Sequence, residues 1–155
     1  MISISQATKN DIGILTDMRI LFADELAGKQ DPETESGMRR QLEQYFTEEL
    51  NHTYLCCYAR INGVPGSIAG LVLRKQPGSL KNPSGKWGYF MNVYTLPEFR
   101  RMGLSAQLIN ALTEQAAALG YTSFELHATP QGAKIYEKIG FQLHPEPTYR
   151  KFIDA

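Results

Sequence analysis

The stretch that decides the fold is YTLPEFRRMGLS, residues 94–105, in which the end of a strand runs through a short loop into a long helix. After the loop, apolar side chains recur at the three- and four-residue spacing of one helix face, at Leu104, Leu108, Ile109, Leu112, Ala116 and Leu119. Gly120 follows directly and is a common left-handed helix stop. The sequence therefore predicts a strand–loop–helix unit over residues 94–118.

The loop of this unit has the composition of an anion-binding site. The first N–H groups of a helix have no partner within the helix and lie at the positive end of its dipole. Gly103 lets an anion approach the backbone, and Arg100 and Arg101 add guanidinium groups suited to phosphate oxygens. On spacing alone, an ordinary helix N-terminus with two solvated arginines is an equally good interpretation. The patterns G-x-x-x-x-G-K-S/T and G-x-G-x-x-G are both absent, so a phosphate site needs support from elsewhere in the chain.

Two segments together resemble the GCN5-related N-acetyltransferase (GNAT) superfamily. Its members carry Gln/Arg-x-x-Gly-x-Gly/Ala in the loop that binds the pyrophosphate of acetyl-CoA. Arg100-x-x-Gly103-x-Ser105 matches this pattern except at Ser105, which leaves open how strongly the coenzyme binds. The second segment, GAKIYEKIGF at residues 132–141, is similar to the family's small-x-x-Leu/Ile-Tyr-Glu/Lys-Lys/Arg-Leu/Ile-Gly-Phe segment. The order and separation of the two segments also fit the family.

The resemblance implies a transferase that moves the acetyl group of acetyl-CoA directly to a primary amine of a small molecule or peptide, without a covalent enzyme intermediate or a metal. Tyr136 takes the position of the family's general acid, which protonates the leaving thiolate. The general base stays open among Glu25, Glu98, His127 and a water-mediated route. The resemblance also implies the coenzyme-binding residues, which are Val93, Tyr94, Thr95, Arg100, Arg101, Met102, Gly103, Leu104, Ser105 and Ala106.

A second hypothesis is a non-catalytic GNAT-like module that binds CoA or a partner without transferring acetyl groups. The acceptor amine carries no recognisable signature in the sequence. We expect its pocket to be walled by residues 26–38 and by the loop at 76–85. The resemblance also leaves room for a homodimer, because family members often pair through their C-terminal strands.

Composition narrows the class of protein further. The 155 residues, 43% of them hydrophobic, suit a single domain over residues 1–155. Sixteen basic residues balance sixteen acidic ones, and no basic run marks a nucleic-acid surface. The start, MISISQ, lacks the features of a secretory signal, and no stretch approaches the ~18 apolar residues of a membrane span. We therefore expect a cytoplasmic protein with neither nucleic-acid nor membrane partners.

Periodicity and turn chemistry predict an α+β arrangement, and the resemblance implies that it is a sandwich-like fold of the GNAT type. The adjacent Cys56 and Cys57 fall in a strand, where neighbouring side chains face opposite ways, so no disulfide is predicted. We expect a mixed, mostly antiparallel sheet of seven strands with about four helices. The expected strands are 1–6, 53–61, 67–75, 86–95, 122–127, 141–144 and 149–153, and the expected helices begin near residues 8, 31, 104 and 129.

Overall fold

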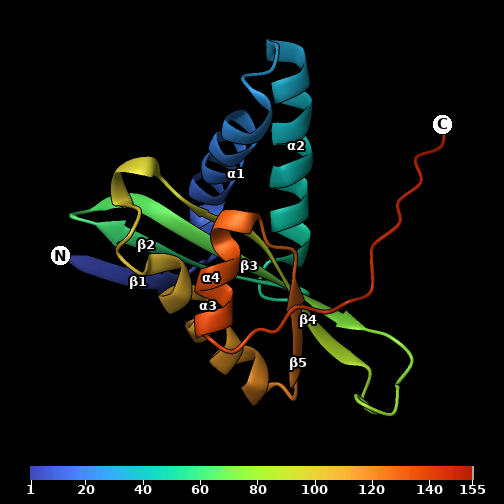
Figure 1. Ribbon diagram of the computed structural model, residues 1–155. Coiled ribbons are helices and arrows are strands. Elements are labelled where there is room, and N and C mark those ends of the chain that lie inside the picture. The colour runs from blue at the N-terminus through green and yellow to red at the C-terminus, as the bar shows by residue number, and fades with distance from the viewer. Residues whose placement is uncertain (155) are drawn as a thin grey trace.

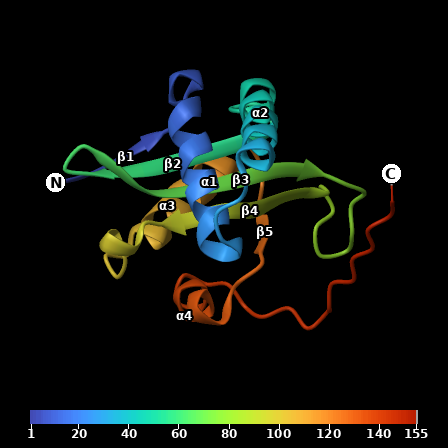
Figure 2. The ribbon, with the colours of Figure 1, turned by 90° about the horizontal axis from the view of Figure 1, so that it is seen from above.

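The computed structural model describes residues 1–154 and places one mixed sheet between two layers of helices (Figures 1 and 2). The sheet has the strand order β1-β2-β3-β4-β5. The first four strands are antiparallel neighbours, and β5 lies parallel to β4. The strands are β1 (Ile2–Gln6), β2 (Tyr54–Ile61), β3 (Val64–Lys75), β4 (Lys86–Thr95) and β5 (Ser123–Leu126).

Local sequence signals account for where the helices begin. Asp31 accepts a hydrogen bond from the N–H of Thr34 at the start of α2, and Thr129 accepts one from Gly132 at the start of α4. Thr8 caps a short 3₁₀ turn that precedes α1. The helices are α1 (Ile12–Ala27), α2 (Pro32–Glu49), α3 (Leu104–Ala118) and α4 (Pro130–Lys138), with 3₁₀ turns η1 (Lys9–Asp11) and η2 (Pro97–Phe99). Within residues 1–154 every helix is too short or too polar to cross a bilayer.

The core has two parts, one on each face of the sheet. Leu55, Cys57 and Ala59 of β2 pack on the side of α3, while Tyr54, Cys56 and Tyr58 pack on the side of α1 and α2. This alternation is the period of two expected for a strand buried on both faces. Cys56 and Cys57 are buried free thiols on opposite faces, so they cannot bridge each other. The prediction of a sandwich-like α+β fold with four α-helices is confirmed for the described residues.

The predicted count of seven strands is wrong, because residues 1–154 form five. Within the described part of the chain, the segments 141–144 and 149–153 have no partner strand, and the outer edge of β5 is unpaired. Pro145 and Pro147 lack the N–H groups that a ladder needs. Apolar alternation predicts a strand only where one face becomes buried, and here Leu143, Tyr149 and Phe152 are at least 90% exposed.

Candidate functional site

β4 and β5 pair along only part of their length. The parallel ladder runs from Trp87 opposite Ser123 to Phe90 opposite Leu126 and then stops. Residues 91–95 of β4 keep β3 as a partner on one edge, while no strand of residues 1–154 lies beside their other edge. Such an edge offers free N–H and C=O groups to an extended chain. The predicted coenzyme residues Val93, Tyr94 and Thr95 lie on this open edge.

A β-bulge lies at the point where the edge opens. Ile68 pairs with Tyr94 and Gly70 with Met91, so that Asn92 and Val93 together oppose the single residue between Ile68 and Gly70. Asn92 has a positive φ of 56°, a conformation that Asn adopts more readily than most residues. Its Nδ2 donates to Tyr54 Oη at 3.1 Å. A β-bulge changes the direction in which nearby backbone groups point, which is common beside functional sites. The sequence did not predict the bulge at Asn92.

The loop before α3 has the backbone of an anion site. Arg101 and Gly103 both have positive φ, 65° and 73°, and Met102 between them does not. Alternation of this kind turns successive N–H groups toward one side. Gly103 caps α3 without a side-chain acceptor, unlike the caps of α2 and α4. A Cβ placed on Gly103 would meet nothing within 4 Å, so the space beside this residue is open, and the first N–H groups of α3 have no partner within the helix.

The guanidinium of Arg100 is hydrogen-bonded to other residues of the protein, Glu25 and Thr95. Its Nη2 lies 2.7 Å from each carboxylate oxygen of Glu25, and its Nε donates to the carbonyl of Thr95 at 3.0 Å. Glu25 also accepts a hydrogen bond from Tyr94 Oη at 3.2 Å. Burial, followed by the charge of Glu25, raises the pKa of Tyr94. The contacts join the end of α1 to the end of β4, and they occupy the carboxylate that sequence analysis had kept as a candidate base.

Ser105 belongs to a chain of three hydroxyl groups. Ser67 Oγ lies 2.7 Å from Thr95 Oγ1, which lies 3.2 Å from Ser105 Oγ. These bonds connect β3, the end of β4 and the first turn of α3. The departure from Gly or Ala in the resemblance therefore has a structural reason, because the serine hydroxyl reaches back to β4.

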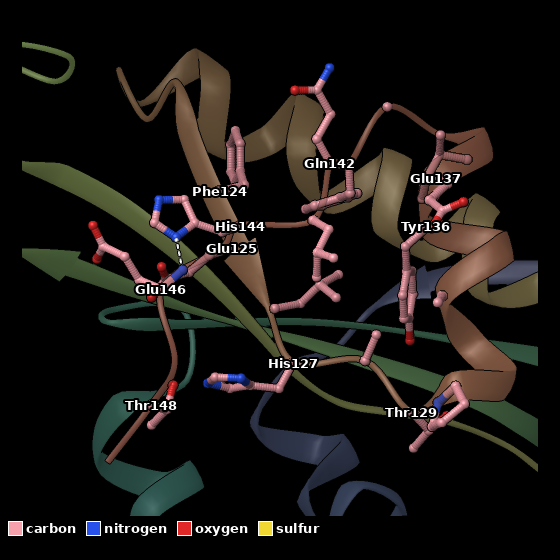
Figure 3. Close-up of a pocket in the computed structure, with 18 of the residues that line it drawn as sticks. Phe124, Glu125, His127, Thr129, Tyr136, Glu137, Gln142, His144, Glu146 and Thr148 are labelled. Carbon is pink, nitrogen blue, oxygen red and sulfur yellow. Dashed lines mark hydrogen bonds between the residues drawn. The ribbon is translucent and has the colours of Figure 1, made fainter.

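Tyr136 lies on α4 at the wall of a groove of about 1160 Å³ between β5, α4 and the C-terminal segment (Figure 3). Its ring packs edge-on against Phe141, 6.2 Å between centroids, and folds back over Gly132. Burial raises the pKa of the phenol, so Tyr136 is protonated at neutral pH. Figure 3 shows the ring reaching from α4 toward the segment that follows His127.

The other two base candidates are exposed. Glu98 lies in η2, and His127 follows β5 with its ring edge-on to Tyr89, 5.6 Å between centroids. His127 lines the same groove as Tyr136, whereas Glu98 does not. Within residues 1–154 neither forms a hydrogen bond with Tyr136, and no group of three metal-binding side chains occurs. His127 is therefore the only one of the three carboxylate or imidazole candidates that shares the groove of Tyr136.

An open strand edge that leads into an uncapped helix N-terminus defines an α+β domain suited to an extended ligand that carries phosphates. The profile of the acetyltransferase (GNAT) family matches residues 18–141. The chain belongs to this family, which confirms the resemblance and the prediction of an acyltransferase. No curated protein sequence matches the chain significantly.

Solved structures of the same fold span nearly the whole chain. A predicted acetyltransferase from Clostridium acetobutylicum, crystallised with acetyl-CoA, superimposes with a TM-score of 0.82 at 22% identity, over 97% of this chain and 96% of that one. A GCN5-related N-acetyltransferase from Ralstonia eutropha superimposes with a TM-score of 0.79 at 22% identity, over 97% of this chain and 99% of that one. Glucosamine-6-phosphate N-acetyltransferase from Arabidopsis thaliana gives 0.72 at 15% identity, over 99% of each chain. At these identities the likeness is one of fold.

Proposed function

We propose that the protein transfers the acetyl group of acetyl-CoA directly to a primary amine of a small molecule or peptide. The observation that carries the proposal is the continuity of two features in one β4–α3 unit. The open edge of Val93 to Thr95 leads within a few residues to the free N–H groups around Gly103. An extended pantetheine arm matches the edge, and a pyrophosphate matches the loop.

Different residues of the β4–α3 unit bind different parts of the coenzyme. The backbone of Val93 to Thr95 pairs with the amide groups of the pantetheine arm, and the N–H groups from Arg101 to Ala106 hold the phosphates. Arg101, exposed beside the loop, adds positive charge near the phosphates. Arg100 adds positive charge while it is paired with Glu25, and its hydrogen bond to the carbonyl of Thr95 holds the loop against the end of β4.

The chemistry requires polarisation of the thioester and two proton movements. A backbone N–H on the open edge of β4, from Val93 at the bulge or from Thr95 beyond it, stabilises the developing oxyanion. Tyr136, which burial keeps protonated, donates its proton to the leaving thiolate. The amine loses its proton to His127 or, through water, to solvent. Direct attack by the amine requires no covalent enzyme intermediate.

A two-part experiment tests the proposal. Mass spectrometry of protein purified without added ligand shows whether CoA co-purifies, and calorimetry measures the affinity for acetyl-CoA. A panel of primary amines with thiol-release detection then measures transfer. We expect coenzyme binding and turnover of at least one amine. Binding without turnover of any amine would favour the non-catalytic module, and no binding would contradict both hypotheses.

A further inference from the structure

A second cavity lies on the α1 and α2 side of the sheet, against the bulge of β4. Its volume is about 290 Å³, and it is lined by residues of α1, α2, β2 and β4. Ligand sites usually measure roughly 300–1,000 Å³, so this one suits a single small molecule of amino-acid size. The loop at 76–85, which the sequence analysis expected to wall the acceptor pocket, takes no part in it.

Aromatic rings form a fixed wall of this cavity. Tyr54 lies 5.5 Å from the ring of Tyr45 and 5.6 Å from that of Phe46. Tyr54 and Phe46 are each 1% exposed, so their positions are set by the core. A Cβ at Gly70 would overlap the hydroxyl of Tyr54, which shows how closely the ring is seated on the sheet. Such a wall favours a flat or branched apolar group.

Arg19 is the charged side chain in the lining of the cavity. It is half-buried on α1, and within residues 1–154 the ion pairs that form do not include it. Its guanidinium lies 5.4 Å from the centre of the Phe22 ring. Burial raises the pKa of Tyr54, and the charge of Arg19 acts in the opposite direction. A guanidinium beside an apolar wall is well suited to grip an anionic group with two hydrogen bonds.

Asn92 supplies a fixed polar group next to the open edge of β4. Its Nδ2 is committed to Tyr54 Oη, and among the hydrogen bonds of residues 1–154 its Oδ1 accepts none. An amide oxygen held in this way can accept a hydrogen bond from an amine. Val93, the next residue, begins the edge that we assign to the coenzyme. An amine at Asn92 therefore lies close to the point of transfer.

Arg19 and Asn92 line the same cavity of about 290 Å³, in which Asn92 is hydrogen-bonded to the hydroxyl of Tyr54, so a small molecule in it can place an anionic group on one residue and an amine on the other. We propose that the acceptor is an α-amino acid with an apolar or aromatic side chain, its carboxylate on Arg19, its amine at Asn92 Oδ1 and its side chain against Tyr45, Phe46 and Tyr54. The inference rests on the proposed function, because it assigns the acceptor of the same reaction. In the reaction the amine nitrogen forms the amide bond as the thioester C–S bond breaks, and the proton lost by the amine balances the one gained by the thiolate.

The test compares amines that differ in one group. kcat/KM is measured for L-phenylalanine, L-phenylalaninamide and 2-aminoethyl phosphate with the native protein and with Arg19→Gln, Arg19→Lys and Arg40→Gln. Arg40 is an exposed arginine of α2 outside the cavity and serves as the matched control. The amide also differs from the acid in amine basicity, so the decisive quantity is the change in the ratio of kcat/KM between variants.

We expect Arg19→Gln to lower the ratio of acid to amide by about 10- to 100-fold, since a hydrogen bond to a charged group contributes about 1.5–3 kcal/mol. Arg19→Lys keeps the charge but lacks the planar guanidinium, so its ratio of acid to amide should lie between those of the native protein and Arg19→Gln. Arg40→Gln should leave the ratio unchanged. An unchanged ratio in a folded Arg19→Gln protein would overturn the inference while the proposed function stands. Preference for 2-aminoethyl phosphate over L-phenylalanine would assign Arg19 to a phosphate and overturn the amino-acid acceptor.

A binding measurement separates this inference from failure of the proposed function. N-acetyl-L-phenylalanine, the expected product, is titrated calorimetrically into the protein saturated with CoA. Binding that is lost in Arg19→Gln but kept in Arg40→Gln supports the cavity even if no amine is turned over. No heat of binding at millimolar product, in a protein that binds CoA, would contradict it.

Discussion

Glu25 near the end of α1 and Arg100 ahead of α3 form a two-oxygen contact, with one guanidinium nitrogen 2.7 Å from each carboxylate oxygen. The two residues are 75 positions apart in sequence. Their side chains are 40% and 44% exposed, so the pair contributes about 0–1 kcal/mol to stability. Its main effect is to hold the Arg100 guanidinium beside the loop that we assign to the coenzyme and to neutralise part of its charge.

Replacing Glu25 by Gln should tighten acetyl-CoA binding about two- to fivefold at low salt, because Arg100 then keeps its full charge near the phosphates and exposed pairs contribute up to about 1 kcal/mol. The gain should fade as salt is raised. Calorimetry at two ionic strengths measures it, with Glu48→Gln on α2 as a distant control. Weaker binding in Glu25→Gln would mean that the carboxylate positions Arg100 rather than neutralises it.

Gly103→Ala should weaken acetyl-CoA binding about tenfold or more, through loss of charged hydrogen bonds of about 1.5–3 kcal/mol to the phosphates. The methyl group would enter the open space that we assign to the pyrophosphate. Gly63→Ala is the matched control, since Gly63 also has a positive φ, 84°, and open space around it, but lies in the β2–β3 turn. Both changes carry a conformational strain of about 1–2 kcal/mol. Equal affinities for acetyl-CoA in the two folded variants would remove the loop from the site.

Ser105→Ala should lower the free energy of unfolding by about 0.5–1.5 kcal/mol, because it removes the hydrogen bond that joins α3 to Thr95. The affinity for acetyl-CoA should stay nearly the same, since alanine fits the family pattern at this position. Urea unfolding and calorimetry measure the two quantities, with Ser36→Ala on the exposed surface of α2 as control. A large loss of affinity would show that the hydroxyl serves the coenzyme directly.

Tyr136→Phe should lower kcat by about 10²–10⁴-fold and leave the acetyl-CoA dissociation constant unchanged, because the ring and its packing on Phe141 remain while the proton is lost. Burial raises the pKa of this phenol above its ordinary value near 10, so its acid form persists through neutral pH. An alkaline fall in kcat caused by Tyr136 should therefore lie above pH ~10 and be absent from the variant. Tyr121→Phe, a buried phenol outside the groove, is the control. Full turnover by Tyr136→Phe, with chemistry limiting the rate, would leave Tyr136 a packing residue.

Local signals in the sequence predicted the elements whose causes are local. The caps Asp31 and Thr129 and the spacing of Leu104 to Ala116 predicted the helices, and the prediction that Cys56 and Cys57 face opposite sides of a strand is confirmed. The loop at Gly103 was also predicted, from the strand–loop–helix pattern and the family resemblance. Whether Val93 to Thr95 and residues 100–106 bind the coenzyme stays a prediction.

Features that depend on distant partners left no such signal. The contact of Glu25 with Arg100 and the hydroxyl chain from Ser67 to Ser105 join residues that the sequence keeps far apart. The bulge had one local sign, an asparagine within a run of strand-forming residues at Asn92. Residues 141–154 alternate as strands do, but a strand also requires a partner and a buried face, which a pattern alone cannot supply.

The most direct test of the account is to follow the acetyl group itself. The purified protein is mixed with acetyl-CoA that carries an isotopically labelled acetyl group, with and without an amine acceptor, and both protein and small molecules are analysed by mass spectrometry. We predict label on the amine together with free CoA, and no labelled protein when the amine is omitted. Label that accumulates on the protein, or acetyl-CoA that is bound but never consumed with any amine, would contradict direct acetyl transfer.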